Sequence, residues 1–157
     1  MSSGKLAADG TCTVTTAEAA KGLASLRVGD EVRFSKTVGE TDIYLFAGIT
    51  GDFYEMHVNE EVMKASRFGT RIAHGALIVG FMSTTAGMMI GRSGEPAVSL
   101  GYDRVRFTAP VKVGDTVTVT YRISSLHPSR SRALADVVAT NQHGETVAVA
   151  THIIRYL

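Results

Sequence analysis

The sequence predicts an α+β fold in which one antiparallel β-sheet wraps around a single long central helix. An apolar stretch from about Gly75 to about Met89 has no polar face, as expected of a buried helix. Four later segments alternate apolar with polar residues and are rich in β-branched residues, which is typical of strands. Short turn motifs separate these segments, so neighbouring strands are expected to form antiparallel hairpins.

The first half of the chain carries the other predicted elements. Residues 1–24 are rich in Ser, Gly, Ala and Thr without periodicity and are expected to form a flexible leader. Residues 25–157 then form a single domain, which begins with an alternating strand at Glu31–Val38. Apolar spacing predicts a short helix around residues 43–47, capped by Glu40 or Thr41. A further short helix is expected at 59–66, with Asn59 as its cap.

The second half of the chain reads as strands joined by turns. The turn motifs lie at 113–115, 128–130 and 141–144, and no repeat or linker indicates a second domain. The predicted strands are Val98–Phe107, Thr116–Ile123, Ala133–Thr140 and Val147–Ile154.

Composition excludes several classes of protein. The 157 residues are 45% hydrophobic and 20% charged, close to the average of globular domains. A net charge of about +1 argues against nucleic acid as a partner. The apolar stretch 72–90 contains His74, Ser83 and several glycines, so we interpret it as a buried helix rather than a membrane span. The single cysteine, Cys12, and the absence of a signal-like N-terminus favour the cytoplasm.

The loop Gly51–His57 is the first candidate site. It holds Asp52 and His57 five residues apart after a glycine, so their side chains can converge on one point. A carboxylate can accept a proton while a histidine donates one, as hydration of a double bond requires. The same spacing also occurs in ordinary polar surface loops, so the pair alone does not decide between the two interpretations.

The start of the long helix supplies a second candidate feature. The free N–H groups of a helix N-terminus carry partial positive charge and suit a developing oxyanion. Gly75 has no side chain, so a ligand carbonyl can approach its backbone closely. Ser83 is a hydroxyl in an otherwise apolar helix, where it either bonds to its own helix or supports the carboxylate or the water.

Together these segments resemble the MaoC-like, R-specific enoyl-CoA hydratase family. The family hallmark is a Gly-Asp-x-x-x-x-His loop followed by Phe-Gly-x-x-Ile-Ala-His-Gly-x-Leu. This chain has Gly51-Asp52 with His57, and then Phe68 to Leu77 in the second pattern. Later residues also look like the family's strands and turns, so the resemblance covers about 28–157; these are Tyr102, Val105, Phe107, Pro110-Val111 and Gly114-Asp115.

The resemblance implies a hot-dog fold and a lyase that adds water to, or removes it from, an enoyl thioester. It implies that Asp52 activates the water and that His57 protonates the α-carbon. The Gly75 N–H would bind the thioester oxygen, with Ser83 supporting the carboxylate. No cofactor and no metal are implied, because coenzyme A is itself part of the substrate. An acyl-carrier-protein thioester is an equally possible substrate.

The remaining residues of the motif are given supporting roles. His74 is expected to be a structural residue at the helix start, and Ile72 and Ala73 are expected to contact the substrate. The family commonly has Asn-Pro between the aspartate and the histidine, where this chain has Tyr54-Glu55. Tyr54 can shape the acyl pocket in place of that pair. The other three histidines are expected at the surface; they are His127, His143 and His152.

Three further expectations complete the sequence-based hypothesis. Basic residues should meet the phosphates of coenzyme A, with Arg104, Arg106, Lys112, Arg130 and Arg132 as candidates. Exposed sheet edges favour a homodimer or a larger assembly of dimers. A hot-dog thioesterase and a non-catalytic acyl-CoA-binding module remain the alternative functions.

Overall fold

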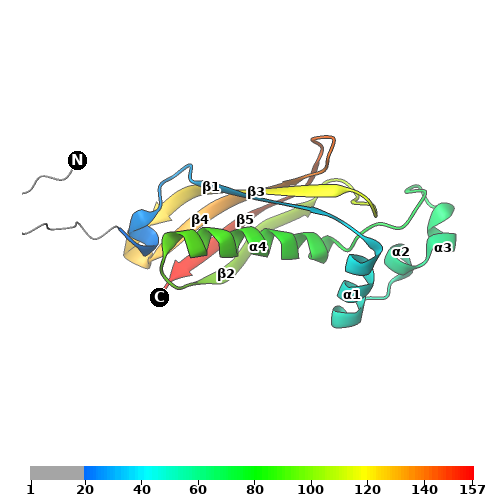
Figure 1. The fold of residues 1–157 in the computed structure, drawn as a ribbon, viewed down its shortest axis with the longest axis horizontal. Helices are drawn as coiled ribbons and strands as arrows, with labels where there is room; N and C mark the ends of the chain where they lie inside the picture. Colours follow the sequence, from blue (N-terminus) through cyan, green and yellow to red (C-terminus); the bar gives the residue numbers. More distant parts are fainter. Residues whose placement is uncertain (1–19) are drawn as a thin grey trace, which may run out of the picture.

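A computed structural model describes residues 20–157 (Figure 1). Residues 1–19 of the predicted leader lie outside the described residues. The leader's last residues belong to a short 3-10 helix, η1 (Gly22–Ser25), and the neighbouring Leu26 is buried in the core. No helix within residues 20–157 is both long enough and apolar enough to span a membrane.

Five strands form one antiparallel sheet in the order β1-β3-β4-β5-β2, so β1 and β2 are its two edges. The four later strands extend further than the alternating segments predicted, because backbone pairing continues into residues whose side chains lack the pattern, whereas the first strand ends one residue before the predicted Val38. Their bounds are β1 (Glu31–Thr37), β2 (Ala97–Phe107), β3 (Thr116–His127), β4 (Arg132–Thr140) and β5 (Thr146–Tyr156).

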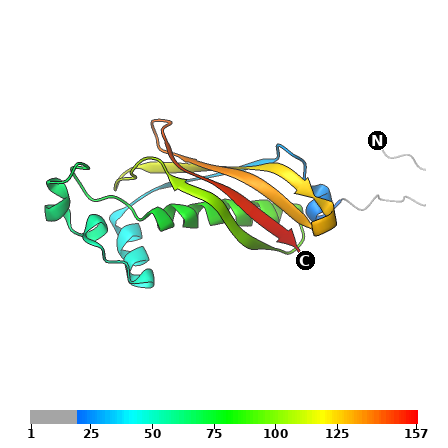
Figure 2. The same ribbon diagram turned by 180° about the vertical axis from the view of Figure 1, so that it is seen from behind.

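Helix α4 (Gly75–Ser93) runs along one face of this sheet, as the two opposite views show (Figures 1 and 2). Its side chains at Ile78, Phe81, Met82 and Met89 are buried against the strands. The facing side chains of β4 are mostly small, so the sheet can approach the helix closely; among them are Ala133, Ala135 and Ala139. The predicted hot-dog arrangement of a sheet around one central helix is confirmed.

Three short helices project beyond one end of the sheet, next to the start of α4 (Figure 1). They are α1 (Glu40–Thr50), α2 (Glu55–Val58) and α3 (Glu60–Lys64). Helix α3 confirms the one expected at 59–66, with Asn59 as its cap accepting from the N–H of Val62, and α2 was not predicted. The expected cap of α1 was wrong: Gly39 is the N-cap, and Asp42 accepts its N–H.

The two sheet edges differ in character. β1 carries three charged side chains, Glu31, Arg33 and Lys36, as is usual for an edge that resists pairing. Along β2, Val98, Leu100 and Phe107 expose 42%, 45% and 54% of their surface. The neighbouring exposed face of α4 carries small residues, and a Cβ added at Gly80 or Gly87 would meet nothing within 4 Å.

Candidate active site

Asp52 is held in place through both its backbone and its side chain. Gly51 ends α1 in the left-handed conformation, with φ 80°, which favours glycine and turns the chain sharply into Asp52. The Asp52 carboxylate then accepts the N–H of Tyr54 at 3.2 Å. The Asp52 carbonyl accepts from Nε2 of His74 at 3.0 Å. The carboxylate is exposed but has a fixed orientation.

His57 lies in the last turn of α2 and is partly buried. Its Nδ1 is 2.7 Å from the carbonyl oxygen of Ile72. A carbonyl can only accept, so Nδ1 carries the hydrogen and donates it. Nε2 is therefore the nitrogen that remains free to exchange a proton with a substrate.

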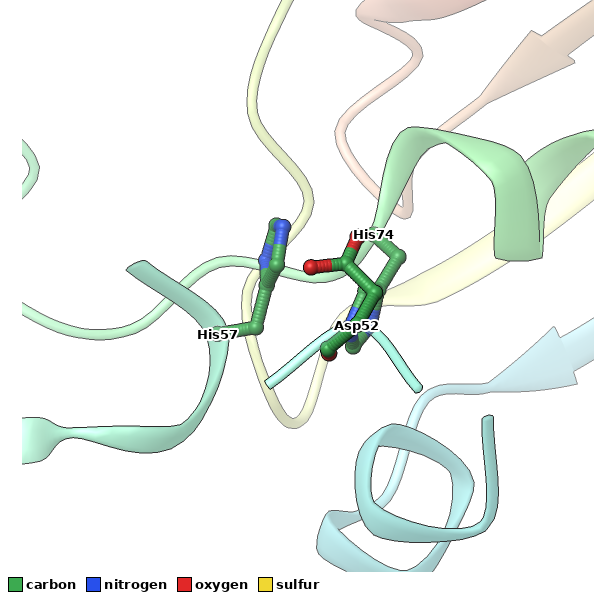
Figure 3. A group of neighbouring side chains, drawn as sticks. All are labelled: Asp52, His57 and His74. Carbon is green, nitrogen blue, oxygen red and sulfur yellow. The ribbon is translucent and has the colours of Figure 1, made fainter. Parts of the chain in front are cut away.

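His74, at the N-cap of α4, brings these two residues together (Figure 3). Its imidazole is 1% exposed, and its ring stacks on that of His57 with centroids 3.9 Å apart and an interplanar angle of 29°. Nε2 donates to the Asp52 carbonyl, while the buried Nδ1 has no partner among the described residues. A carboxylate oxygen of Asp52 and one ring nitrogen from each histidine lie within 4.8 Å of one another.

This cluster has the residue types of a metal site, but its ring geometry does not suit one. An imidazole binds a metal in the plane of its ring at about 2.0–2.1 Å. The rings of His57 and His74 are stacked, so no point at that distance lies in both planes. His57 Nδ1 and His74 Nε2 are also engaged with backbone carbonyls. The arrangement is better suited to moving protons between an acid and a base.

Gly75 begins α4 at the same place. The helix has no side-chain cap, so its first N–H groups are free to bind an incoming oxygen. The Phe107 ring packs directly over Gly75, and a Cβ built on the glycine would lie 2.7 Å from ring atoms of Phe107. Only a residue without a side chain leaves this N–H accessible beside that ring.

A cavity of about 180 Å³ opens between His57 and Gly75. Its walls are otherwise apolar and include Ile72 and Ala73. An apolar cavity with two convergent polar groups is typical of a small-molecule site. Several lining residues were not assigned a role by the sequence analysis; they are Met56, Ile78, Phe107, Ala109, Pro110, Val111 and Val147.

The segment 71–74 that carries these groups is fixed on both sides. The Ala73 N–H donates to the Val111 carbonyl at 2.7 Å, and the Ile72 N–H donates to the Met56 carbonyl. Arg71 is mostly buried and pairs with Glu60 of α3 and Glu40 of α1. Hydrogen bonds from Arg71 lower the pKa of Glu60, and the two carboxylates raise that of Arg71. Arg71 therefore clamps α1 and α3 to this segment.

Two predicted site residues stand apart from this cluster. Ser83 is exposed on α4, eight residues after Gly75, which is about 12 Å along the helix axis. The structure therefore does not bring it to Asp52 within one chain. Tyr54 is 63% exposed and does not line the cavity, although its ring meets His57 edge-on at 6.4 Å.

His152 corrects another expectation. It was predicted at the surface, yet it is fully buried and bonded to both Tyr121 and Ser99. The sequence suggested exposure because histidine is polar, but here its position on β5 faces the core and two hydroxyl groups satisfy both ring nitrogens.

Comparison with known proteins shows the family of this chain. The family model described as MaoC like domain matches residues 23–147. The chain belongs to the MaoC-like domain family. The resemblance drawn from the motifs at Gly51–His57 and Phe68–Leu77 is thereby confirmed.

Relatives of this MaoC-like domain agree in both sequence and fold. It is 40% identical over 105 residues to an (R)-specific enoyl-CoA hydratase from Rhodospirillum rubrum, covering 67% of this chain and 71% of the relative. It is 36% identical over 108 residues to a 3-hydroxybutyryl-CoA dehydratase from Methylorubrum extorquens, covering 69% and 67%. The unliganded R-hydratase PhaJ1 from Pseudomonas aeruginosa superposes with a TM-score of 0.78 at 29% identity, covering 86% of this chain and 84% of that one.

Proposed function

We propose that this MaoC-like domain is a lyase that adds water to, or removes it from, the double bond of an enoyl-CoA thioester. The observation that carries the proposal is that His57 and Gly75 line one apolar cavity, with the Asp52 carboxylate close to the His57 ring. The groups proposed to act are the Asp52 carboxylate, the free Nε2 of His57 and the uncapped N–H of Gly75. The relatives named as hydratases and dehydratases support the same reaction class.

In the hydration direction, Asp52 takes a proton from water while the water oxygen bonds to the β-carbon. The imidazolium of His57 gives a proton from Nε2 to the α-carbon, and the fixed Nδ1–H···O=C bond to Ile72 keeps that nitrogen directed toward the cavity. Dehydration reverses both transfers. Two protons are exchanged at two sites, so the reaction needs an acid and a base held at a short, fixed separation.

Gly75 supplies the third part of the mechanism. When water attacks the β-carbon, negative charge develops on the thioester oxygen, and an N–H at a helix N-terminus stabilises that charge. The reaction needs a carbonyl that can be polarised, so the expected substrate is an enoyl thioester and not an isolated alkene. Ile72 and Ala73, which line the cavity, would then contact the acyl chain.

The test is the hydration of crotonyl-CoA, followed by loss of the enoyl absorbance with free thiol measured in parallel. Wild type is expected to remove the absorbance without releasing thiol. Asp52→Asn and His57→Gln are each expected to lower kcat by about 100-fold or more, because each removes one proton-transfer group. Glu55→Gln is the matched control, because Glu55 is an exposed acid in the same segment.

The same assay separates the alternatives. Thiol release by wild type would favour a thioesterase, and retained acyl-CoA binding with no turnover would favour a binding module. Wild-type hydration rates in Asp52→Asn or His57→Gln would show that the proton-transfer groups lie elsewhere.

We also propose that two copies of this chain associate through the β2 edge and the exposed face of α4. The apolar side chains on β2 and the small residues on α4 support this choice of surface. Pairing of the two β2 strands would continue the sheet, and the small residues would let two α4 helices approach closely. In such a dimer the exposed Ser83 would lie at the interface with the second copy.

The proposed reaction requires no metal and no cofactor besides the coenzyme A of the substrate. Nucleic acid and membrane have no part in it. We place the reaction in the cytoplasm, since the single cysteine indicates no dependence on an oxidising compartment.

A further inference from the structure

A second groove continues the active-site cavity toward the surface. It has a volume of about 240 Å³ and shares Ile72, Phe107, Ala109 and Pro110 with the cavity. Its outer part is lined by Arg67, Phe68 and Thr108. A ligand whose reacting end lies at Gly75 could therefore extend along this groove until it reaches Arg67.

Arg67 is held in an orientation that leaves its charge available. Its guanidinium lies over the Phe68 ring, 4.8 Å from the centroid, and no carboxylate among residues 20–157 forms an ion pair with it. Arg71, four residues later, is the opposite case because Glu40 and Glu60 occupy its guanidinium. Stacking on an aromatic ring restricts the Arg67 side chain without using its N–H donors.

Lys112 adds a second cation next to Ile72, which lines the groove. It pairs with Ile72 in an isolated antiparallel bridge, so its side chain leaves the backbone on the same face as that of Ile72. It is exposed and makes no ion pair with the described residues, in contrast to Lys64, which pairs with Glu61. Arg67 in the wall of the groove and Lys112 beside Ile72 are thus two available positive charges.

The fold also excludes two candidates suggested by the sequence. Arg130 and Arg132 lie where β3 turns into β4, at the end of the sheet opposite to α1–α3 (Figure 1). They are therefore far from the groove. Arg67 was not among the sequence candidates, because no local pattern indicates that the segment around Arg67 lies beside Phe107 in the fold.

We propose that Arg67, assisted by Lys112, binds a phosphate on the pantetheine arm that carries the acyl group. This inference rests on the proposed function, which places the thioester at Gly75. The groove accommodates the uncharged pantetheine, and a guanidinium presents paired N–H donors that match phosphate oxygens. Coenzyme A and acyl carrier protein share this phosphopantetheine chemistry, so the phosphate is the common feature recognised.

The experiment compares three crotonyl thioesters that differ only in phosphate content: crotonyl-pantetheine, crotonyl-phosphopantetheine and crotonyl-CoA. Arg67→Ala is expected to raise KM for crotonyl-CoA by about fivefold to tenfold with kcat nearly unchanged, since the contact is remote from the reacting atoms. Lys112→Ala should act in the same direction with a smaller effect. Lys64→Ala is the matched control, and crotonyl-pantetheine should show no change in any variant.

The outcomes identify the phosphate and its source. Equal effects with crotonyl-phosphopantetheine and crotonyl-CoA would support binding of the phosphate common to both carriers. An effect with crotonyl-CoA alone would overturn recognition of the shared phosphate and indicate that Arg67 binds the adenosine phosphates instead. An equal KM increase with crotonyl-pantetheine, or no increase with any substrate, would overturn the proposal.

Two further readouts separate this inference from the proposed reaction. Calorimetric binding of crotonyl-CoA should weaken in Arg67→Ala by the same factor as KM, and this holds even if wild type shows no turnover. Added salt should raise the wild-type KM for phosphorylated substrates and change it less in Arg67→Ala, because screening weakens only charge-dependent contacts. Failure of hydration with intact binding would contradict the proposed reaction alone.

Discussion

Gly75 supplies an N–H and also leaves the space through which a ligand reaches it. Adding a single methyl group at this position tests whether that access matters. In Gly75→Ala the new Cβ would lie 2.7 Å from the Phe107 ring. Phe107 is 54% exposed, so its ring can move outward and folding should be largely preserved. We expect kcat/KM for crotonyl-CoA to fall by about 10- to 100-fold, because the methyl blocks access to the oxyanion N–H.

The second variant, Gly75→Ala with Phe107→Ala, distinguishes blocked access from a displaced ring. Removing the ring relieves the contact but leaves the methyl beside the N–H, so activity should stay well below that of Phe107→Ala alone. Recovery to that level would show that the single variant acted by moving Phe107. Circular dichroism and thermal unfolding of each variant confirm that the fold is retained.

Sequence reasoning at the residue scale found the groups whose chemistry is visible in a motif. Asp52, His57 and Gly75 were predicted because an acid, an imidazole and a helix-initiating glycine occur at informative spacings. The partner of His57 Nδ1 is a backbone carbonyl, and any residue could supply it. The Arg71 clamp depends on two carboxylates that lie 11 and 31 residues away in sequence, which no local pattern reveals.

At the element scale, strand β2 carries the test of the proposed dimer. Leu100 is 45% exposed on this edge, and its replacement by Arg should place a charge where two strands would pair. Sedimentation is expected to show a wild-type dimer and a Leu100→Arg monomer at micromolar concentration. Val28→Lys is the control, because Val28 is 64% exposed but lies outside β2. A wild-type monomer, or an unchanged dimer in Leu100→Arg, would contradict this interface.

Elements with a repeating pattern were predictable, and their ends were not. The alternation in β3 predicted a strand to Ile123, yet the strand runs on to His127 after an irregularity in its pairing with β4. Helix α4 continues past Met89 to Ser93, because Gly94 provides the left-handed ending that closes it. Such ends depend on pairing partners and backbone conformation rather than on apolar periodicity.

For the whole molecule, the decisive constraint is how the sheet and α4 share one core. Small side chains on β4 allow Tyr121 of β3 and His152 of β5 to meet across it, with the Tyr121 hydroxyl 2.8 Å from Nδ1 of His152. Ser99 of β2 lies 2.7 Å from Nε2, so one polar network links three strands. This long-range contact explains why sequence alone misplaced His152 at the surface.

The buried network predicts how stability depends on pH. Burial lowers the pKa of His152 to about 4, from 6.5 when the side chain is free. Between these values the unfolded chain binds a proton that the folded chain does not, so the free energy of unfolding falls as pH drops from 6.5 toward 4. The decrease in the free energy of unfolding that comes from His152 should approach about 3 kcal/mol. It should not grow further once the pH is below the pKa of the folded state.

His152→Gln isolates this contribution, because glutamine retains hydrogen-bonding groups for Tyr121 and Ser99 but does not titrate. Urea unfolding between pH 6.5 and 4 should show that the free energy of unfolding falls less with decreasing pH in the variant than in wild type. His143→Gln serves as the control, since His143 is exposed and its removal should leave the wild-type slope intact. If the free energy of unfolding of His152→Gln falls with pH as steeply as that of wild type, the acid sensitivity arises from carboxylates. The network would then contribute packing alone.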